Sequence, residues 1–149
     1  MPIIGFSINK IQAEKSGEIN QNVDIASDLK ISKVSEEKVV IDKAQTALRF
    51  DFDFIVNYNP NFGNINLSGY ILYMEGEETA KKILESWKKS KVLEPGLMEK
   101  LFNSILMRCN IKALLLSQEL NLPPHIRLPI VVSEKESKEL KSKKDNYIG

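Results

Sequence analysis

The spacing of apolar residues changes once along this chain, close to Met74, and that change limits what the chain can fold into. Before it, apolar and polar residues alternate, most regularly between Leu48 and Tyr58. An apolar residue at every second position is typical of a β-strand with one buried face. After it, apolar residues recur at the intervals of an amphipathic helix. The sequence therefore predicts an α+β fold, in which a sheet precedes helices.

The alternating stretches fall around residues 4–8, 23–31, 48–58 and 65–74, so four strands are expected. The segment NYNPNFGN, which joins the last two, is rich in Asn, Pro and Gly and predicts a hairpin with a long turn. Gly69 lies inside the last strand. A glycine there indicates a bulge or the close approach of another backbone.

Two helices are predicted after the strands. The first covers residues 76–91, with acidic residues in its first turn and lysines at its end, as the helix dipole favours. The second, longer helix is predicted to begin at Pro95 and to run to about Glu119. Its stretch IKALLL is apolar on several faces, which favours contact with another subunit. The predicted interface residues are Leu101, Ile105, Ile111, Leu114 and Leu115.

Composition narrows the class of protein. The 149 residues suffice for one hydrophobic core, and a net charge of +1 excludes long-range attraction to nucleic acid or anionic membranes. The single cysteine cannot form an internal disulfide, and the first residues show no secretory signal, so we expect a cytoplasmic protein without a membrane-inserted segment. We expect a single domain over residues 1–132 and a charged, flexible tail over 133–149.

Side chains suited to catalysis are few. Cys109 and His125 are the only cysteine and the only histidine, and a buried thiol and a structural histidine are the preferred interpretations. Asp51 and Asp53 point to one side of a strand and could hold a divalent cation. Because they alternate with phenylalanines, they are better interpreted as the polar face of a half-buried strand. We therefore predict no metal, no cofactor and no enzymatic activity.

The stretch LNLPPHIRLPIVV, residues 120–132, is apolar, and its prolines prevent a helix. Its apolar side chains either pack back on the sheet and helices or form one wall of a long groove that takes extended peptides. Strand alternation assigns the phenylalanine stripe mainly to the core and favours Tyr70 as an accessible aromatic residue. The predicted peptide-binding residues are Phe54, Tyr70, Tyr73, Leu122, Ile126 and Leu128.

The order of four strands and two helices resembles the SecB family of export chaperones. Similar local stretches are INKIQAEK, ALRFDFDFIVNY, INLSGYILY, and the pair LF at 101–102 followed by LNLPP at 120–124. The resemblance spans roughly residues 3–132 and implies an antiparallel four-stranded sheet backed by helices. It also implies a tetramer assembled as a dimer of dimers, and ATP-independent binding of unfolded polypeptides in hydrophobic grooves.

The chain departs from the family in two ways. It is neutral where SecB proteins are acidic, and it lacks the proline that usually follows LF. We therefore carry over the fold and peptide binding but not the export pathway.

Three alternatives to a chaperone stay open. The first is a structural adaptor of the same fold whose grooves are filled by its own subunits. The second is RNA contact by the lysine-rich tail, which the acidic residues of that tail argue against. The third is a small enzyme that uses Asp51, Asp53 or His125.

Overall fold

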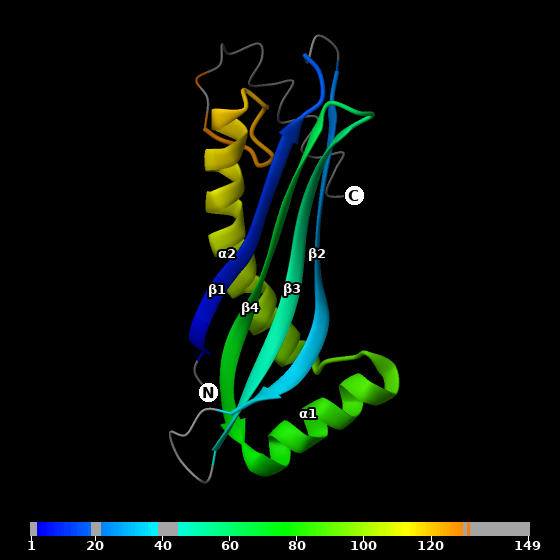
Figure 1. Cartoon of the computed structure of the whole chain (residues 1–149), viewed down its shortest axis with the longest axis vertical. Helices are drawn as coiled ribbons and strands as arrows, with labels where there is room; N and C mark the ends of the chain where they lie inside the picture. Colours follow the sequence, from blue (N-terminus) through cyan, green and yellow to red (C-terminus); the bar gives the residue numbers. More distant parts are fainter. Residues whose placement is uncertain (1–2, 19–21, 39–44, 130, 132–149) are drawn as a thin grey trace.

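The computed structural model describes residues 3–18, 22–38, 45–129 and 131. It contains a four-stranded sheet followed by two helices, which confirms the predicted α+β class (Figure 1). The predicted C-terminal tail lies outside the described residues. The elements are β1 (Ile3–Lys15), β2 (Asp24–Glu37), β3 (Gln45–Asn59), β4 (Gly63–Gly76), α1 (Glu77–Ser90) and α2 (Pro95–Glu119).

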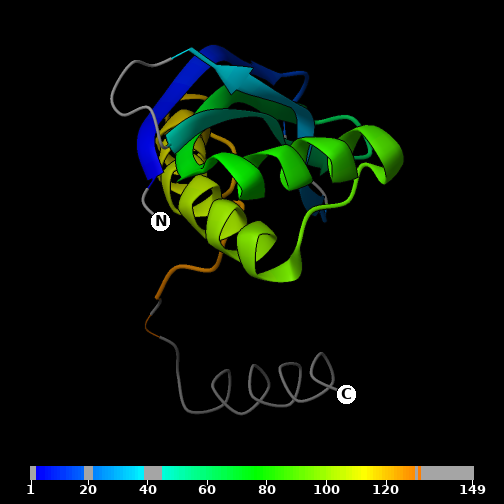
Figure 2. The same ribbon diagram turned by 90° about the horizontal axis from the view of Figure 1, so that it is seen from below.

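The sheet is antiparallel throughout, in the order β1-β4-β3-β2. β3 and β4 form the predicted hairpin, paired from Gln45 opposite Gly76 to Tyr58 opposite Gly63. β1 and β2 are the two edges of the sheet. Seen from below, both helices lie on the same side of the sheet (Figure 2). The described residues therefore form two layers, and neither of their helices covers the other face of the sheet.

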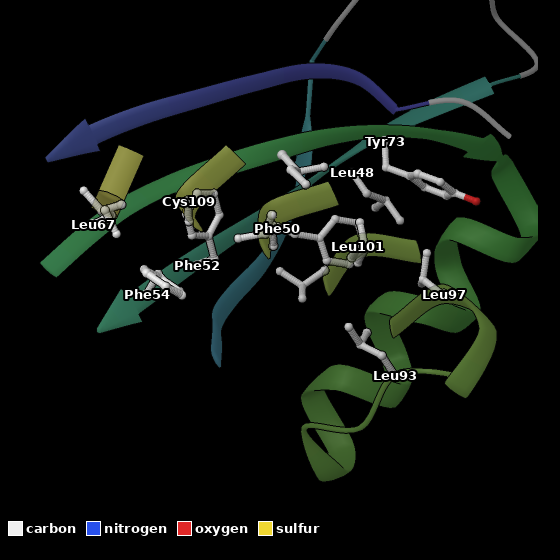
Figure 3. Packing of buried hydrophobic residues seen from close by; sticks show 14 of the residues in the cluster. Leu48, Phe50, Phe52, Phe54, Leu67, Tyr73, Leu93, Leu97, Leu101 and Cys109 are labelled. Atoms are coloured by element: carbon white, nitrogen blue, oxygen red, sulfur yellow. The ribbon is translucent and has the colours of Figure 1, made fainter. Parts of the chain in front are cut away.

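The covered face of the sheet is the hydrophobic core. Alternation along β3 places its large apolar side chains there, and residues of α2 at four-residue intervals pack onto them (Figure 3). The phenylalanine stripe is thus confirmed as core, and Trp87 of α1 is also buried. The main buried residues are Leu48, Phe50, Phe52, Phe54, Val56 and Tyr58 from β3, Leu67, Ile71 and Tyr73 from β4, and Leu97, Leu101, Ile105, Cys109 and Ala113 from α2.

The other sheet face is polar. Arg49 forms a salt bridge with Asp51, 3.1 Å between Nη2 and Oδ1, and its guanidinium lies 4.0 Å above the centre of the Tyr70 ring. Ser68 donates a hydrogen bond of 2.7 Å to Asp53. Both carboxylates therefore have partners within the sheet, as expected for the outer face of a half-buried strand.

Gly69 lies where β1 comes closest to β4. The pairing register of β1 shifts between Ile8 and Lys10, directly beside Gly69, which confirms the predicted irregularity. A Cβ atom at this position would overlap the Ser7 carbonyl oxygen and lie 2.9 Å from Ile8 Cα. Only glycine permits this approach without moving the edge strand.

The helix boundaries agree with the sequence. α2 begins at Pro95, as predicted, where the missing N–H costs the helix no hydrogen bond. α1 ends at Ser90 and is capped by Lys91, which has φ of 57° and whose N–H donates to the Trp87 carbonyl. Neither helix within the described residues combines the length and hydropathy that crossing a bilayer requires.

Candidate functional site

Residues 121–129, here called the strap, leave the end of α2 and pass beside β3. The Leu122 N–H donates to the Ser117 carbonyl (2.8 Å), and the Tyr58 hydroxyl donates to the Pro123 carbonyl (2.7 Å). Burial raises the pKa of Tyr58, so this donor keeps its proton near neutral pH. The Leu122 side chain is buried. The beginning of the strap is therefore fixed to both the helix and the sheet.

His125 is a second anchor for the strap. Its Nε2 lies 2.8 Å from Asn110 Oδ1 of α2, and its ring meets Phe54 edge to face at 6.1 Å between centres. Its Nδ1 is buried and has no hydrogen-bond partner among the described residues. The neutral ring with a proton on Nε2 satisfies the Asn110 contact, and burial lowers the pKa of His125. His125 thus holds the strap against α2 and β3, as expected for a histidine with a structural role.

Acid should weaken this anchor. In the unfolded chain a histidine titrates near pH 6.5, whereas His125 in the folded chain has a lower pKa. Between the two pKa values the unfolded chain binds more protons than the folded chain. The contribution of His125 to the free energy of unfolding is therefore complete above about pH 6.5 and decreases as the pH falls below it. Urea denaturation at pH 7.5 and 5.5 should show a smaller pH effect for His125→Gln than for wild type. An equal pH effect in both proteins would contradict this assignment.

A groove of about 860 Å³ lies between the strap and the second half of α2. Its volume falls in the range of protein sites that hold ligands. Most of the lining side chains are apolar, and none of them is charged. They are Ile111, Leu114, Leu115, Ser117, Gln118, Asn121, Leu122, Pro123, Pro124 and Leu128. We call this site the α2–strap groove.

Large apolar side chains are exposed on and around the groove. Met107, Ile111 and Leu115 follow one another at four-residue intervals on the side of α2 that faces away from the sheet, and they are 68%, 59% and 52% exposed. Ile126 and Leu128 of the strap are also exposed. Contiguous apolar surface of this kind marks a binding site for another molecule.

The groove unites residues from the two sets predicted from the sequence. Leu122 and Leu128, predicted to bind peptide, face it together with Ile111, Leu114 and Leu115, predicted for a subunit interface. Ile126 is exposed on the strap but does not line the groove. The sequence analysis did not predict the lining residues Ser117, Gln118, Asn121, Pro123 and Pro124. The two prolines predict the end of α2, but their place beside the groove depends on the path of the strap, which the sequence does not indicate.

Other predicted site residues lie elsewhere. Leu101 and Ile105 are fully buried against the sheet, so the structure assigns them to the core and not to a surface of α2. Phe54 and Tyr73 are also core residues, because alternation turns them toward the helices. Tyr70 is half-buried on the opposite sheet face beneath Arg49, so it cannot share a groove with the strap.

Within the described residues, the side chains considered for metal binding or catalysis are buried or already have partners. No three His, Cys, Asp or Glu side chains converge within the part of the chain that the structure describes. Cys109 is fully buried, and burial raises its pKa to about 11, so it stays a protonated, unreactive thiol. A polar hollow of about 540 Å³ on the outer sheet face contains Asp51 and Asp53, whose carboxylates are already held by Arg49 and Ser68.

No protein-family model matches the chain, and no curated protein matches it. Among solved structures, the chain is similar to the SecB-like chaperone Rv1957 of Mycobacterium tuberculosis, with a TM-score of 0.52 and 12% sequence identity, over 89% of this chain and 91% of that one. The fold is SecB-like. That neighbour was solved in complex with a ChAD peptide from the HigA1 antitoxin. At this identity the likeness extends to the fold alone, and in this SecB-like chain the groove is formed by the long helix and the segment that follows it.

Proposed function

We propose that this protein is a SecB-like, ATP-independent chaperone that binds unfolded or extended polypeptides. The observation that carries the proposal is the α2–strap groove, about 860 Å³ of mostly apolar space with exposed leucines and isoleucines around it. The SecB-like fold and the peptide complex of its structural neighbour support the proposal. We infer a non-enzymatic, cytoplasmic role, with non-native polypeptides as partners.

The chemistry of the groove suits polypeptide better than a small polar ligand. Its polar lining side chains are Ser117 and Gln118 of α2 and Asn121 at the start of the strap, and the rest of the strap contributes prolines and leucines. Burying each large apolar side chain contributes roughly 1.5–3 kcal/mol. A client that inserts a few such side chains would bind by area and shape, with little dependence on its sequence.

The substitution Leu115→Asp tests this site. It places a charge inside the apolar groove and removes one apolar contact, so we expect the affinity for an unfolded client to fall roughly 10- to 100-fold. The folded state should be little affected, because Leu115 is 52% exposed. Fluorescence anisotropy with a labelled, permanently unfolded protein measures the affinity, and a client-aggregation assay measures the activity.

Val92→Asp is the matched control. Val92 is an apolar residue between α1 and α2, 57% exposed, and does not line the groove, so this variant should bind like wild type. Equal affinities for wild type and both variants would rule out the α2–strap groove as the client-binding site. Failure of the wild type to bind any unfolded polypeptide would rule out the function.

A second candidate, a structural adaptor, is favoured by the apolar stripe of Met107, Ile111 and Leu115. Other copies of the chain, for example in a tetramer, could cover this stripe and close the groove. Light scattering combined with a dye that binds exposed apolar surface separates the two functions. A closed oligomer that binds no dye would favour the adaptor, whereas dye binding that an unfolded client displaces would favour the chaperone.

A further inference from the structure

The segment that forms the groove is basic although the whole chain is nearly neutral. α2 and the strap, residues 95–129, contain the acidic residues Glu99 and Glu119 and the basic residues Lys100, Arg108, Lys112 and Arg127. The net charge of these two elements is +2 by those residues, compared with +1 for the whole chain. The positive charge is therefore concentrated on the elements that form the groove.

The basic side chains flank the apolar stripe of α2. Arg108 and Lys112 each follow a residue of that stripe, Met107 and Ile111, so on the helix a basic row runs beside the apolar row with the same spacing. Arg127 is exposed and precedes Leu128, which lines the groove from the strap. Lys112 and Arg127 are thus direct chain neighbours of the lining residues Ile111 and Leu128, and no lining side chain is itself charged.

Arg108, Lys112 and Arg127 have no carboxylate partner within the described residues. Lys112 and Arg127 make no ion pair or hydrogen bond there, and the Arg108 guanidinium lies over the Phe6 ring, 4.7 Å from its centre. A charge without a partner beside an apolar groove attracts a ligand with opposite charges at its own border. It also repels a ligand with like charges there.

We propose that the α2–strap groove selects extended polypeptide segments in which acidic residues flank apolar ones. This inference rests on the proposed function and names the class of client. The uncharged, mostly apolar lining favours a polypeptide over a polyanion such as nucleic acid, because apolar side chains of the ligand must fill the groove. Carboxylates on either side of those apolar side chains would then lie near the cations. Segments with flanking lysines or arginines are disfavoured by the same charges.

Three labelled peptides test the selection. They share one core of alternating leucine and phenylalanine, and their flanking residues are glutamate, serine or lysine. At low salt we expect the glutamate peptide to bind best and the lysine peptide worst, with a gain of roughly two- to fivefold for each carboxylate that meets a cation. The differences should shrink in 0.5 M salt, because screening weakens exposed charge pairs. A glutamate peptide without apolar residues should bind at least tenfold more weakly.

The double variant Lys112→Glu with Arg127→Glu should reverse the order of the glutamate and lysine peptides and leave the serine peptide within about twofold of wild type. Lys88→Glu on α1 is the control and should preserve the wild-type order, because this exposed lysine lies on the other helix. Circular dichroism checks that all variants fold.

The outcomes separate the two proposals. If the serine peptide binds the groove but all three peptides bind equally, or the lysine peptide binds best, the charge selection is overturned and the chaperone function stands. If none of the three peptides binds, the proposed function fails and the selection with it. Equal binding of the glutamate peptide without apolar residues would also overturn the selection, since the groove would then play no part.

Discussion

Phe52→Ala is expected to lower the free energy of unfolding by about 3–5 kcal/mol, the usual cost of removing a buried phenylalanine. Phe52 is 1% exposed near the middle of β3. Its ring stacks on Phe6 of the edge strand β1, 5.5 Å between centres and 24° between planes (Figure 3 shows Phe52 beside α2). Alanine would leave a cavity between the sheet and α2 and remove the stacking contact with Phe6 of β1. Urea denaturation followed by circular dichroism measures the loss.

Met107→Ala is the control for this loss. Met107 is 68% exposed on α2, so its truncation should cost less than about 0.5 kcal/mol. Similar losses for the two variants would mean that the helices do not cover the phenylalanine face of the sheet.

Gly69→Ala should also destabilise the fold strongly, by about 3 kcal/mol. The added Cβ would meet the backbone of β1 at Ser7 and Ile8, and backbone cannot rotate away as a side chain can. β1 would have to move away from β4 along the register shift beside Lys10. Thermal denaturation measures the loss, and hydrogen exchange should show faster exchange in β1 than in β2.

The matched control is Gly76→Ala. Gly76 ends β4 and precedes α1, and a Cβ there would meet no atom within 4 Å. Its backbone angles suit any residue, so the cost should stay below about 1 kcal/mol, as for the loss of a glycine at a helix start. If Gly69→Ala were no more costly than Gly76→Ala, the close approach of β1 and β4 would be refuted.

Much of the fold could be predicted because its signals are local. Alternation along β3 fixes which side chains share a face, and a proline at the start of α2 marks where that helix begins. The irregularity at Gly69 could be predicted as well, since a glycine inside a strand has few other uses. The order of the strands within the sheet is not local information, and it was not predicted from the sequence. The antiparallel arrangement of all four strands came only through the resemblance to the SecB family.

The candidate site was harder to predict, and α2 shows why. One apolar row, Leu101 with Ile105, faces the sheet, whereas another, Ile111 with Leu115, faces away. Both rows have helical spacing and similar hydropathy, so the sequence alone does not indicate which one the sheet covers. Only the packing of the helix on β3 and β4 decides, and it assigns the first row to the core and the second to the groove.

Photo-crosslinking from one introduced cysteine at a time tests most directly whether the α2–strap groove binds the client. A thiol-reactive photo-crosslinker is attached at Leu115→Cys in the groove or at Tyr70→Cys on the opposite sheet face, and an unfolded client is added. Cys109 should stay unlabelled, because it is buried and its pKa is about 11. A client bound in the α2–strap groove should crosslink from position 115 and only rarely from position 70. Crosslinks from position 70 with none from position 115 would contradict binding of the client in this groove.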